Sequence, residues 1–239
     1  MSRAELEGSN LLKAFPLPIS REGLPFIALF AGISLGLGYF AWPLGVAGAV
    51  ATAWCVWFFR DPDRTPPARP GVIVSPADGR VIKVGPAPPP AELGMGQAAR
   101  TRISTFMNIF DVHVNRIPAD GTVTALHYRP GRFINASFDK ASEHNERLAI
   151  RMTTAEGADL AVVQIAGLLA RRIKCSLRPG QRVRAGERFG MIRFGSRVDL
   201  YLPTDVPALV VAGRKAVAGE TVMADALANE PGREGGGAG

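Results

Sequence analysis

The chain has 239 residues, with 28 Lys and Arg against 21 Asp and Glu, and 47% of its residues are hydrophobic. That apolar fraction excludes an intrinsically disordered chain. Two cysteines, Cys55 and Cys175, are too few and too far apart for a secreted disulfide framework. The net charge of +7 suits an anionic partner, either nucleic acid or a membrane surface.

The distribution of charge favours the membrane. From Leu24 to Phe59 the sequence contains no charged residue and no histidine, whereas one bilayer crossing needs about 20 apolar residues. Pro43 divides this run, and basic residues flank both of its ends, which places both ends in the cytoplasm. We predict a cytoplasmic segment over residues 1–23 and a helical membrane hairpin over residues 24–59, which either spans twice or enters one leaflet.

Two other interpretations of this run are less favoured. A cleaved signal peptide has an apolar core of only about 7–15 residues. A buried hairpin of a soluble protein does not account for the aromatic residues, which gather toward the ends of the run as in interfacial belts.

Residues 60–70 are rich in proline and charge and are typical of a linker. From residue 71 to residue 227, short β-branched runs alternate with turn signals such as Asp78-Gly79 and Asp120-Gly121. This pattern predicts a mainly β domain with few short helices, either a two-layer antiparallel sandwich or a flattened barrel. Residues 228–239 are expected to be disordered.

Two long loops interrupt the strand pattern. Residues 85–100 are dominated by Pro and Ala, which is typical of disorder. Residues 131–145 are typical of a substrate lid and contain several polar and aromatic side chains: Arg132, Phe133, Asn135, Phe138, Lys140, His144 and Asn145.

The sequence contains little that could bind a metal or a nucleotide. Its three histidines, His113, His127 and His144, lack the spacing of a helical zinc motif, and no cysteine lies near them. Neither a Walker-type phosphate loop nor a dinucleotide-binding glycine pattern is present. We therefore assign no metal and no nucleotide.

Polar residues within apolar, strand-like segments are the better candidates for chemistry. Asp78 begins the turn of SPADG, a position where aspartate is also common for structural reasons. In FMNIFDVHVNRIPADG, the residues Asp111, His113 and Asn115 alternate, so a strand would place all three on one face. Such a group can orient and tune a general base, although a hydrogen-bonded edge strand explains it equally well.

The segment RFGSRVDLYLP contains the third candidate. Gly195-Ser196 interrupts what would otherwise be one continuous strand, and glycine within a strand usually marks a bulge or a bend. A tight turn with a neighbouring serine is the structural alternative.

SPADG, FMNIFDVHVNRIPADG, the triplet Asn145-Glu146-Arg147 and FGSRVDL follow an apolar hairpin in this order. This combination resembles the phosphatidylserine decarboxylase proenzymes of the short bacterial and archaeal type, over about residues 60–211. The resemblance implies a carboxy-lyase that converts phosphatidylserine to phosphatidylethanolamine and carbon dioxide, with its catalytic domain at the cytoplasmic face of the cell membrane.

The resemblance also implies a self-processing zymogen. Ser196 attacks the carbonyl carbon of Gly195, the chain is cleaved between them, and Ser196 becomes a pyruvoyl cofactor that serves as an electron sink. Chains 1–195 and 196–239 then stay associated. By resemblance the base is His113, with Asp78 either orienting it or favouring its charged form, and Asp111 as support.

The sequence departs from some relatives at one point. Other branches of the family carry a second histidine three residues after the first, where this chain has Arg116. The division of roles at His113 is therefore open. Candidate substrate-binding residues, with solvated surface charge as the alternative for the basic ones, are Asn115, Arg132, Lys140 and His144.

Two rival functions come from other classes. The glycine rhythm of residues 176–196 is similar to lipoyl-type hairpins, which favours a membrane-anchored adaptor without catalysis. A carrier domain needs a modifiable lysine at a hairpin tip, whereas Lys174 lies within an apolar run. A nucleic-acid binder has only the net charge in its favour, because no basic stripe alternates with stacking aromatics.

Overall fold

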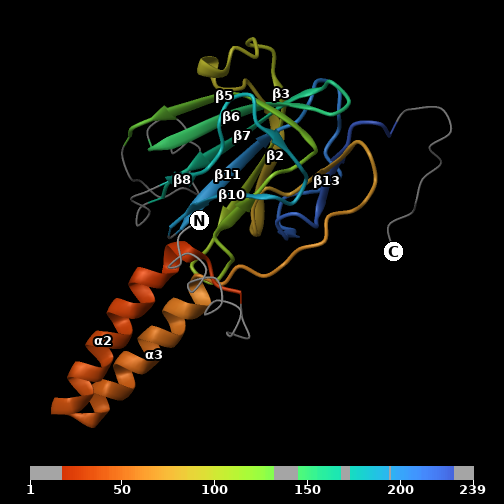
Figure 1. Ribbon diagram of the computed structural model, residues 1–239. Helices are drawn as coiled ribbons and strands as arrows, with labels where there is room; N and C mark the ends of the chain where they lie inside the picture. Colours follow the sequence, from red (N-terminus) through yellow and green to blue (C-terminus); the bar gives the residue numbers. More distant parts are fainter. Residues whose placement is uncertain (1–17, 132–144, 168–172, 194, 229–239) are drawn as a thin grey trace. The chain divides into compact units, whose positions relative to one another are not determined.

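The computed structural model describes residues 18–131, 145–167, 173–193 and 195–228. The chain divides into two compact units, residues 1–63 and 64–239. The first contains the α-helices α2 and α3, and the second contains the strands (Figure 1).

The first unit is a helical hairpin. A 3-10 turn, η1 (Arg21–Gly23), leads into α2 (Leu24–Phe40), and α3 (Trp42–Phe58) follows after one extended residue, Ala41. The break therefore comes before Pro43, which lies in the first turn of α3, where proline lacks only an N–H that has no helical partner. Small residues let the helices approach closely, and the Ser34 hydroxyl donates to the Gly45 carbonyl at 2.9 Å.

The hairpin has the composition of a membrane segment. Within the described part of the chain, one helical stretch, Arg21–Phe40, is long and apolar enough to cross a bilayer, and Trp42–Phe58 is a shorter apolar helix. Large apolar side chains around the turn, including Tyr39, Phe40 and Trp42, are exposed. The predicted pair of apolar helices is confirmed, and whether they span or re-enter stays a prediction.

The second unit is built from antiparallel strands, as predicted (Figure 1). The described strands are β1 (Val72–Val74), β2 (Gly79–Ala87), β3 (Arg100–Met107), β4 (Val114–Arg116), β5 (Gly121–Arg129), β6 (Arg147–Thr154), β7 (Asp159–Ile165), β8 (Ile173–Cys175), β9 (Arg182–Val183), β10 (Arg188–Ile192), β11 (Ser196–Tyr201), β12 (Lys215–Ala216) and β13 (Val222–Asp225).

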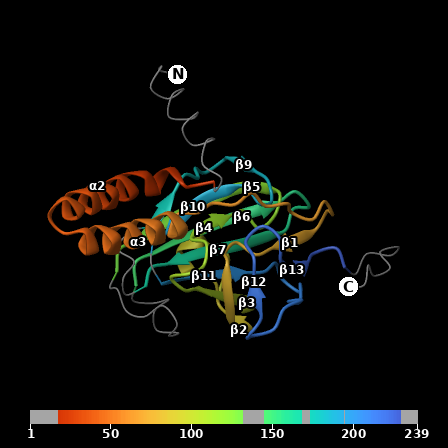
Figure 2. The same ribbon diagram turned by 90° about the horizontal axis from the view of Figure 1, so that it is seen from below.

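These strands form three sheets. The large sheet has the order β12-β2-β3-β11-β7-β6-β5-β9, a second sheet has the order β4-β10-β8, and β1 pairs with β13 (Figure 2). One hydrophobic core contains side chains from all three sheets. Alternation along β11 directs Val198 and Leu200 into this core and Tyr201 to the opposite face of the large sheet.

A short 3-10 helix packs against the outer face of the large sheet. The connection after β2, predicted as disordered, instead forms η2 (Ala91–Leu93), and Leu93 and Met95 are buried against Val163 and Tyr201. The prediction missed this because Leu93 and Met95 are the only large apolar residues in a stretch of Pro, Ala and Gly. Glu92 and Arg147 form an ion pair at 2.6 Å that fastens η2 to β6.

Two arginines of the segment predicted as a linker make ion pairs within the second unit. Arg64 pairs with Asp78 at 3.0 Å, and Arg69 pairs with Asp225 at 2.6 Å. The part of this segment that follows Asp63 is therefore fastened to the β domain.

Candidate active site

Two connections run from the large sheet to the sheet of β4, β10 and β8. Residues 108–113 link β3 to β4, and residues 193–195 link β10 to β11. Because β3 pairs with β11 and β4 pairs with β10, both connections cross between the sheets at the same place. One carries His113 and the other carries Gly195, so the fold brings these two motifs to one corner of the domain.

The SPADG motif, which contains Asp78 and Gly79, lies at the same end of the strands of the large sheet. Arg80 of β2, Phe106 of β3 and Arg197 of β11 lie in one row of paired residues. Gly79 and Ser196, each one position earlier, therefore lie level at the edge and two strands apart, which corresponds to about 10 Å. Gly79 has φ 143°, and a Cβ there would lie 2.1 Å from the Phe106 carbonyl oxygen, so the turn after Asp78 requires glycine.

Ser196 is the first residue of β11 and is completely buried. Its Oγ has no hydrogen-bond partner among the described residues. Gly195 before it has φ 58°, in the left-handed region that favours glycine. The predicted interruption of the strand is confirmed here, since β10 and β11 belong to different sheets.

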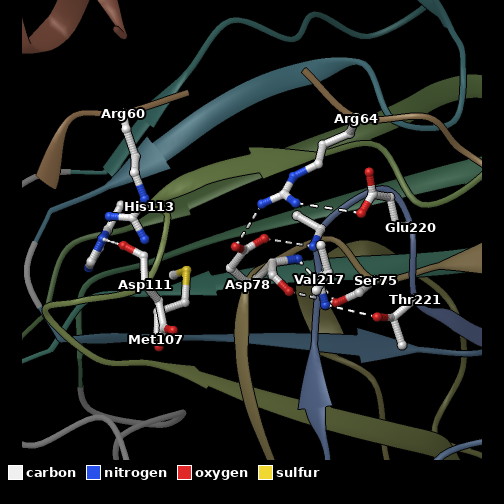
Figure 3. A network of polar contacts seen from close by, with 12 residues as sticks. Arg60, Arg64, Ser75, Asp78, Met107, Asp111, His113, Val217, Glu220 and Thr221 are labelled. Atoms are coloured by element: carbon white, nitrogen blue, oxygen red, sulfur yellow. Dashed lines mark hydrogen bonds and ion pairs between the residues drawn. The ribbon is translucent and has the colours of Figure 1, made fainter. Parts of the chain in front are cut away.

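His113 is completely buried just before β4. Its Nδ1 lies 2.9 Å from the backbone carbonyl oxygen of Asp111 (Figure 3). A carbonyl oxygen only accepts, so Nδ1 carries the proton in the neutral ring and the lone pair is on Nε2.

The Asp111 carboxylate closes a turn. Its Oδ2 accepts a hydrogen bond from the backbone N–H of Asn108 at 2.9 Å. The expectation that Asp111, His113 and Asn115 share one strand face was wrong, because β4 begins only at Val114. Asp111 and His113 both precede the strand, and Asp111 closes a turn. Aspartate competes well for backbone N–H groups in turns, and a strict alternation argument ignores this.

Asp78 lies in a network of polar contacts (Figure 3). Its Oδ2 accepts from Arg64 at 3.0 Å, and its Oδ1 accepts from the Ala218 N–H at 2.7 Å. Arg64 also reaches Glu220 at 3.5 Å. The effect of Asp78 on His113 stays a prediction.

Asn115 joins the two facing sheets and is completely buried. Its Oδ1 accepts from Nε2 of Gln164 on β7 at 2.8 Å, and its Nδ2 approaches Sδ of Met107, the residue paired with Ser196. These contacts favour a positioning role over direct substrate binding. Sequence analysis missed Gln164, although a lone amide within the apolar run DLAVVQI was a usable signal.

Arg116 is structural in this fold. The side chain is buried at the end of β4, and its guanidinium donates to the Gly186 carbonyl at 2.9 Å. An arginine side chain stays protonated at physiological pH and cannot act as a base. It therefore cannot supply a base at the position of the second histidine of other branches.

The amino-acid sequence also matches a known family. Residues 51–224 match the family model for phosphatidylserine decarboxylase. This chain belongs to the phosphatidylserine decarboxylase family.

Similar proteins cover nearly the whole chain. A phosphatidylserine decarboxylase proenzyme of Paramagnetospirillum magneticum is 58% identical over 95% of this chain and 94% of its own length. A proenzyme of the same name from Cereibacter sphaeroides is 55% identical over 95% and 97%, and one from Rickettsia africae is 55% identical over 87% and 90%. The resemblance inferred from the motifs is confirmed.

Phosphatidylserine decarboxylase proenzymes carry a pyruvoyl group derived from a serine, and the residues here fit such a group. The buried Ser196 hydroxyl, with no partner among the described residues, is available for reaction. On the outer face of the sheet, Arg197 and Asp199 form a buried ion pair at 2.9 Å that holds the start of β11. Burial and the nearby Asp199 carboxylate raise the pKa of Tyr201.

Arg132, Lys140 and His144 fall outside the described residues. Lys174 lies within β8 opposite Met191, and this position disfavours a carrier hairpin. In the part of the chain that the structure describes, no group of three His, Cys, Asp or Glu side chains is arranged to hold a metal ion.

Proposed function

We propose that this protein is a self-processing phosphatidylserine decarboxylase in which Ser196 becomes the pyruvoyl group. The observation that carries the proposal is the buried Ser196 hydroxyl, without a hydrogen-bond partner in the described structure, directly after a glycine of positive φ. The reaction releases carbon dioxide from phosphatidylserine and leaves phosphatidylethanolamine.

Processing begins at the bond between Gly195 and Ser196. Oγ attacks the Gly195 carbonyl carbon, the C–N bond breaks, and the nitrogen of residue 196 takes a proton, which gives an ester. Loss of the α-proton of residue 196 then expels the Gly195 carboxylate and leaves a dehydroalanine. Water replaces its nitrogen, which departs as ammonia.

His113 is proposed as the base that receives the Ser196 proton. The Asp111 carbonyl holds Nδ1–H, so the lone pair on Nε2 is the acceptor. Asp78 is proposed to support the charged form of this histidine, and Asp111 supports the ring through its backbone. The pyruvoyl group supplies an electron sink for the decarboxylation.

The other assignments rest on sequence alone. Arg132 and Lys140 are proposed to meet the lipid phosphate, and His144 is proposed to act in the decarboxylation. Asn115 is proposed to position the site through Met107 and Gln164.

We propose that the two products of cleavage remain one folded protein. Chain 196–239 supplies β11, which lies between β3 and β7 in the middle of the large sheet, and β13, which pairs with β1. Removing β11 would expose Val198 and Leu200 of the main core to water.

The two apolar helices are proposed to anchor the enzyme in the cell membrane, with the catalytic domain on the cytoplasmic face. Basic residues flank both ends of the hairpin, in agreement with the positive-inside rule. Lys and Arg near an anionic surface add about 1 kcal/mol each to the attraction.

The test is phosphatidylethanolamine formation by the purified full chain in vesicles that contain phosphatidylserine. We expect product from the unmodified protein and none from Ser196→Ala, because alanine cannot form the pyruvoyl group. A non-catalytic adaptor would give no product from either protein.

A further inference from the structure

The turn at residues 108–111, between β3 and β4, exposes two large apolar side chains. Phe110 is 62% exposed and Ile109 is 36% exposed. Adjacent exposed apolar residues of this size at a turn mark an interaction site more often than isolated ones do.

Hydrogen bonds close the turn. The Asp111 carboxylate accepts from the Asn108 N–H, and the Asn108 Oδ1 accepts from the Phe110 N–H at 2.7 Å. The Asp111 N–H also donates to the Asn108 carbonyl at 3.1 Å. Both polar side chains are used to close the turn, and its two apolar side chains are exposed.

The turn belongs to the corner that holds the candidate active site. It begins directly after Met107, which pairs with Ser196, and ends at Asp111, whose carbonyl holds His113. Ile109 and Phe110 therefore lie beside the place where a lipid headgroup has to arrive.

We propose that Ile109 and Phe110 enter the lipid leaflet and hold the active-site corner at the depth of the headgroups. This inference rests on the proposed function, because a phospholipid substrate keeps its acyl chains in the bilayer. Exposed apolar surface loses contact with water on insertion, and an aromatic ring is well suited to the interface between headgroups and chains. Because the turn ends at Asp111, whose carbonyl contacts His113, the depth of the turn in the membrane also sets the depth of His113.

The activity test compares two substrates for the same enzyme in phosphatidylcholine vesicles. One is long-chain phosphatidylserine within the bilayer, and the other is dihexanoyl phosphatidylserine dissolved in the water below its micelle concentration. Phe110→Ser should lower the rate on the bilayer substrate at least about fivefold and the rate on the dissolved substrate less than about twofold.

Leu209→Ser is the matched control, because Leu209 is 58% exposed in the connection between β11 and β12. It should leave both rates unchanged, and Phe110→Leu should retain most of the bilayer activity. Equal losses on the two substrates, or an equal loss in Leu209→Ser, would overturn the proposal. Equal losses are also the result expected if another copy or residues 132–144 cover Phe110.

A second measurement does not need activity, so it separates this proposal from the proposed function. Tryptophan is introduced as Phe110→Trp or as Leu209→Trp, and fluorescence is recorded in vesicles with and without brominated phosphatidylcholine. Quenching should increase over the unmodified chain for Phe110→Trp only. An unmodified enzyme without activity on either substrate would contradict the proposed function, whereas the absence of extra quenching at residue 110 would contradict the membrane contact.

Discussion

The imidazole of His113 is held by the backbone of Asp111, since Nδ1 lies 2.9 Å from that carbonyl oxygen. The contact fixes the neutral tautomer with the lone pair on Nε2, and it is made by the backbone of residue 111, not by its side chain. A turn closed by Asn108 and Asp111 places the carbonyl. The turn is thus part of how the base is oriented.

His113→Ala should accumulate uncleaved chain, because the Ser196 hydroxyl loses its proton acceptor. A positioned general base contributes about 100-fold or more, so the rate of cleavage should fall by at least that factor. The measurement is the fraction cleaved over time on a denaturing gel.

Asp111→Asn and His127→Ala are the controls for this prediction. Asparagine keeps an oxygen that can close the turn, and His127 is exposed on β5. Both should be cleaved at close to the normal rate, and His144→Ala should affect decarboxylation before cleavage. Normal cleavage in His113→Ala would remove His113 as the base.

Asp78→Asn should slow cleavage while the domain stays folded. Asparagine has the shape of aspartate but lacks the charge that supports a protonated histidine, so we expect a decrease of about tenfold or more. Glu220→Gln is the matched control, because Glu220 contacts the same Arg64 and is more exposed. Equal rates for the two variants would show that the Asp78 charge does not take part.

Gln164→Leu should destabilise the protein by about 1–3 kcal/mol, because it leaves the buried Asn115 oxygen without its donor. The double variant Asn115→Leu/Gln164→Leu removes both amides and should recover part of that loss. Chemical denaturation of the two single variants and the double variant gives the coupling. Purely additive losses would contradict a direct contact between the sheets.

Acid should weaken the attachment of η2 to the outer face of the large sheet. Burial opposes ionisation of Glu92, but a backbone hydrogen bond and the Arg147 charge outweigh it and lower the pKa of this carboxyl. A carboxyl with a lowered pKa stabilises the fold above its unfolded pKa of about 4.3, and this stability is lost as pH falls through the lower folded value.

Glu92→Gln removes this titration. Because Glu92 is one quarter exposed, the free energy of unfolding at pH 7 should decrease by about 0.5–1 kcal/mol in this variant. Thermal unfolding from pH 7 to pH 3 should then show a smaller decrease for Glu92→Gln than for the unmodified chain, with the exposed Glu187→Gln as control. An equal decrease in the two proteins would show that Glu92 does not contribute to the loss of stability in acid.

The strands of the β domain were predictable because β-branched runs and turn signals are local features. Sheet membership was not predictable: Gly195 indicated a break in the strand, but not that β10 and β11 belong to different sheets. That change of sheet is what brings Gly195 to the corner of His113.

The candidate site was likewise predictable only in part. Asp78, His113 and Ser196 were found as polar residues in apolar segments, and the fold brings their motifs to one corner. The wrong expectation for Asp111 came from treating a turn as a strand, and η2 was missed because its burial depends on a sheet formed by distant residues.

Intact-mass measurement of the purified full chain tests self-cleavage at Ser196 most directly. The account predicts two species, residues 1–195 and residues 196–239, with the smaller one lighter by one ammonia than the same fragment beginning with serine. Ser196→Ala should give a single full-length mass. A single full-length mass in enzyme that forms phosphatidylethanolamine would contradict the account.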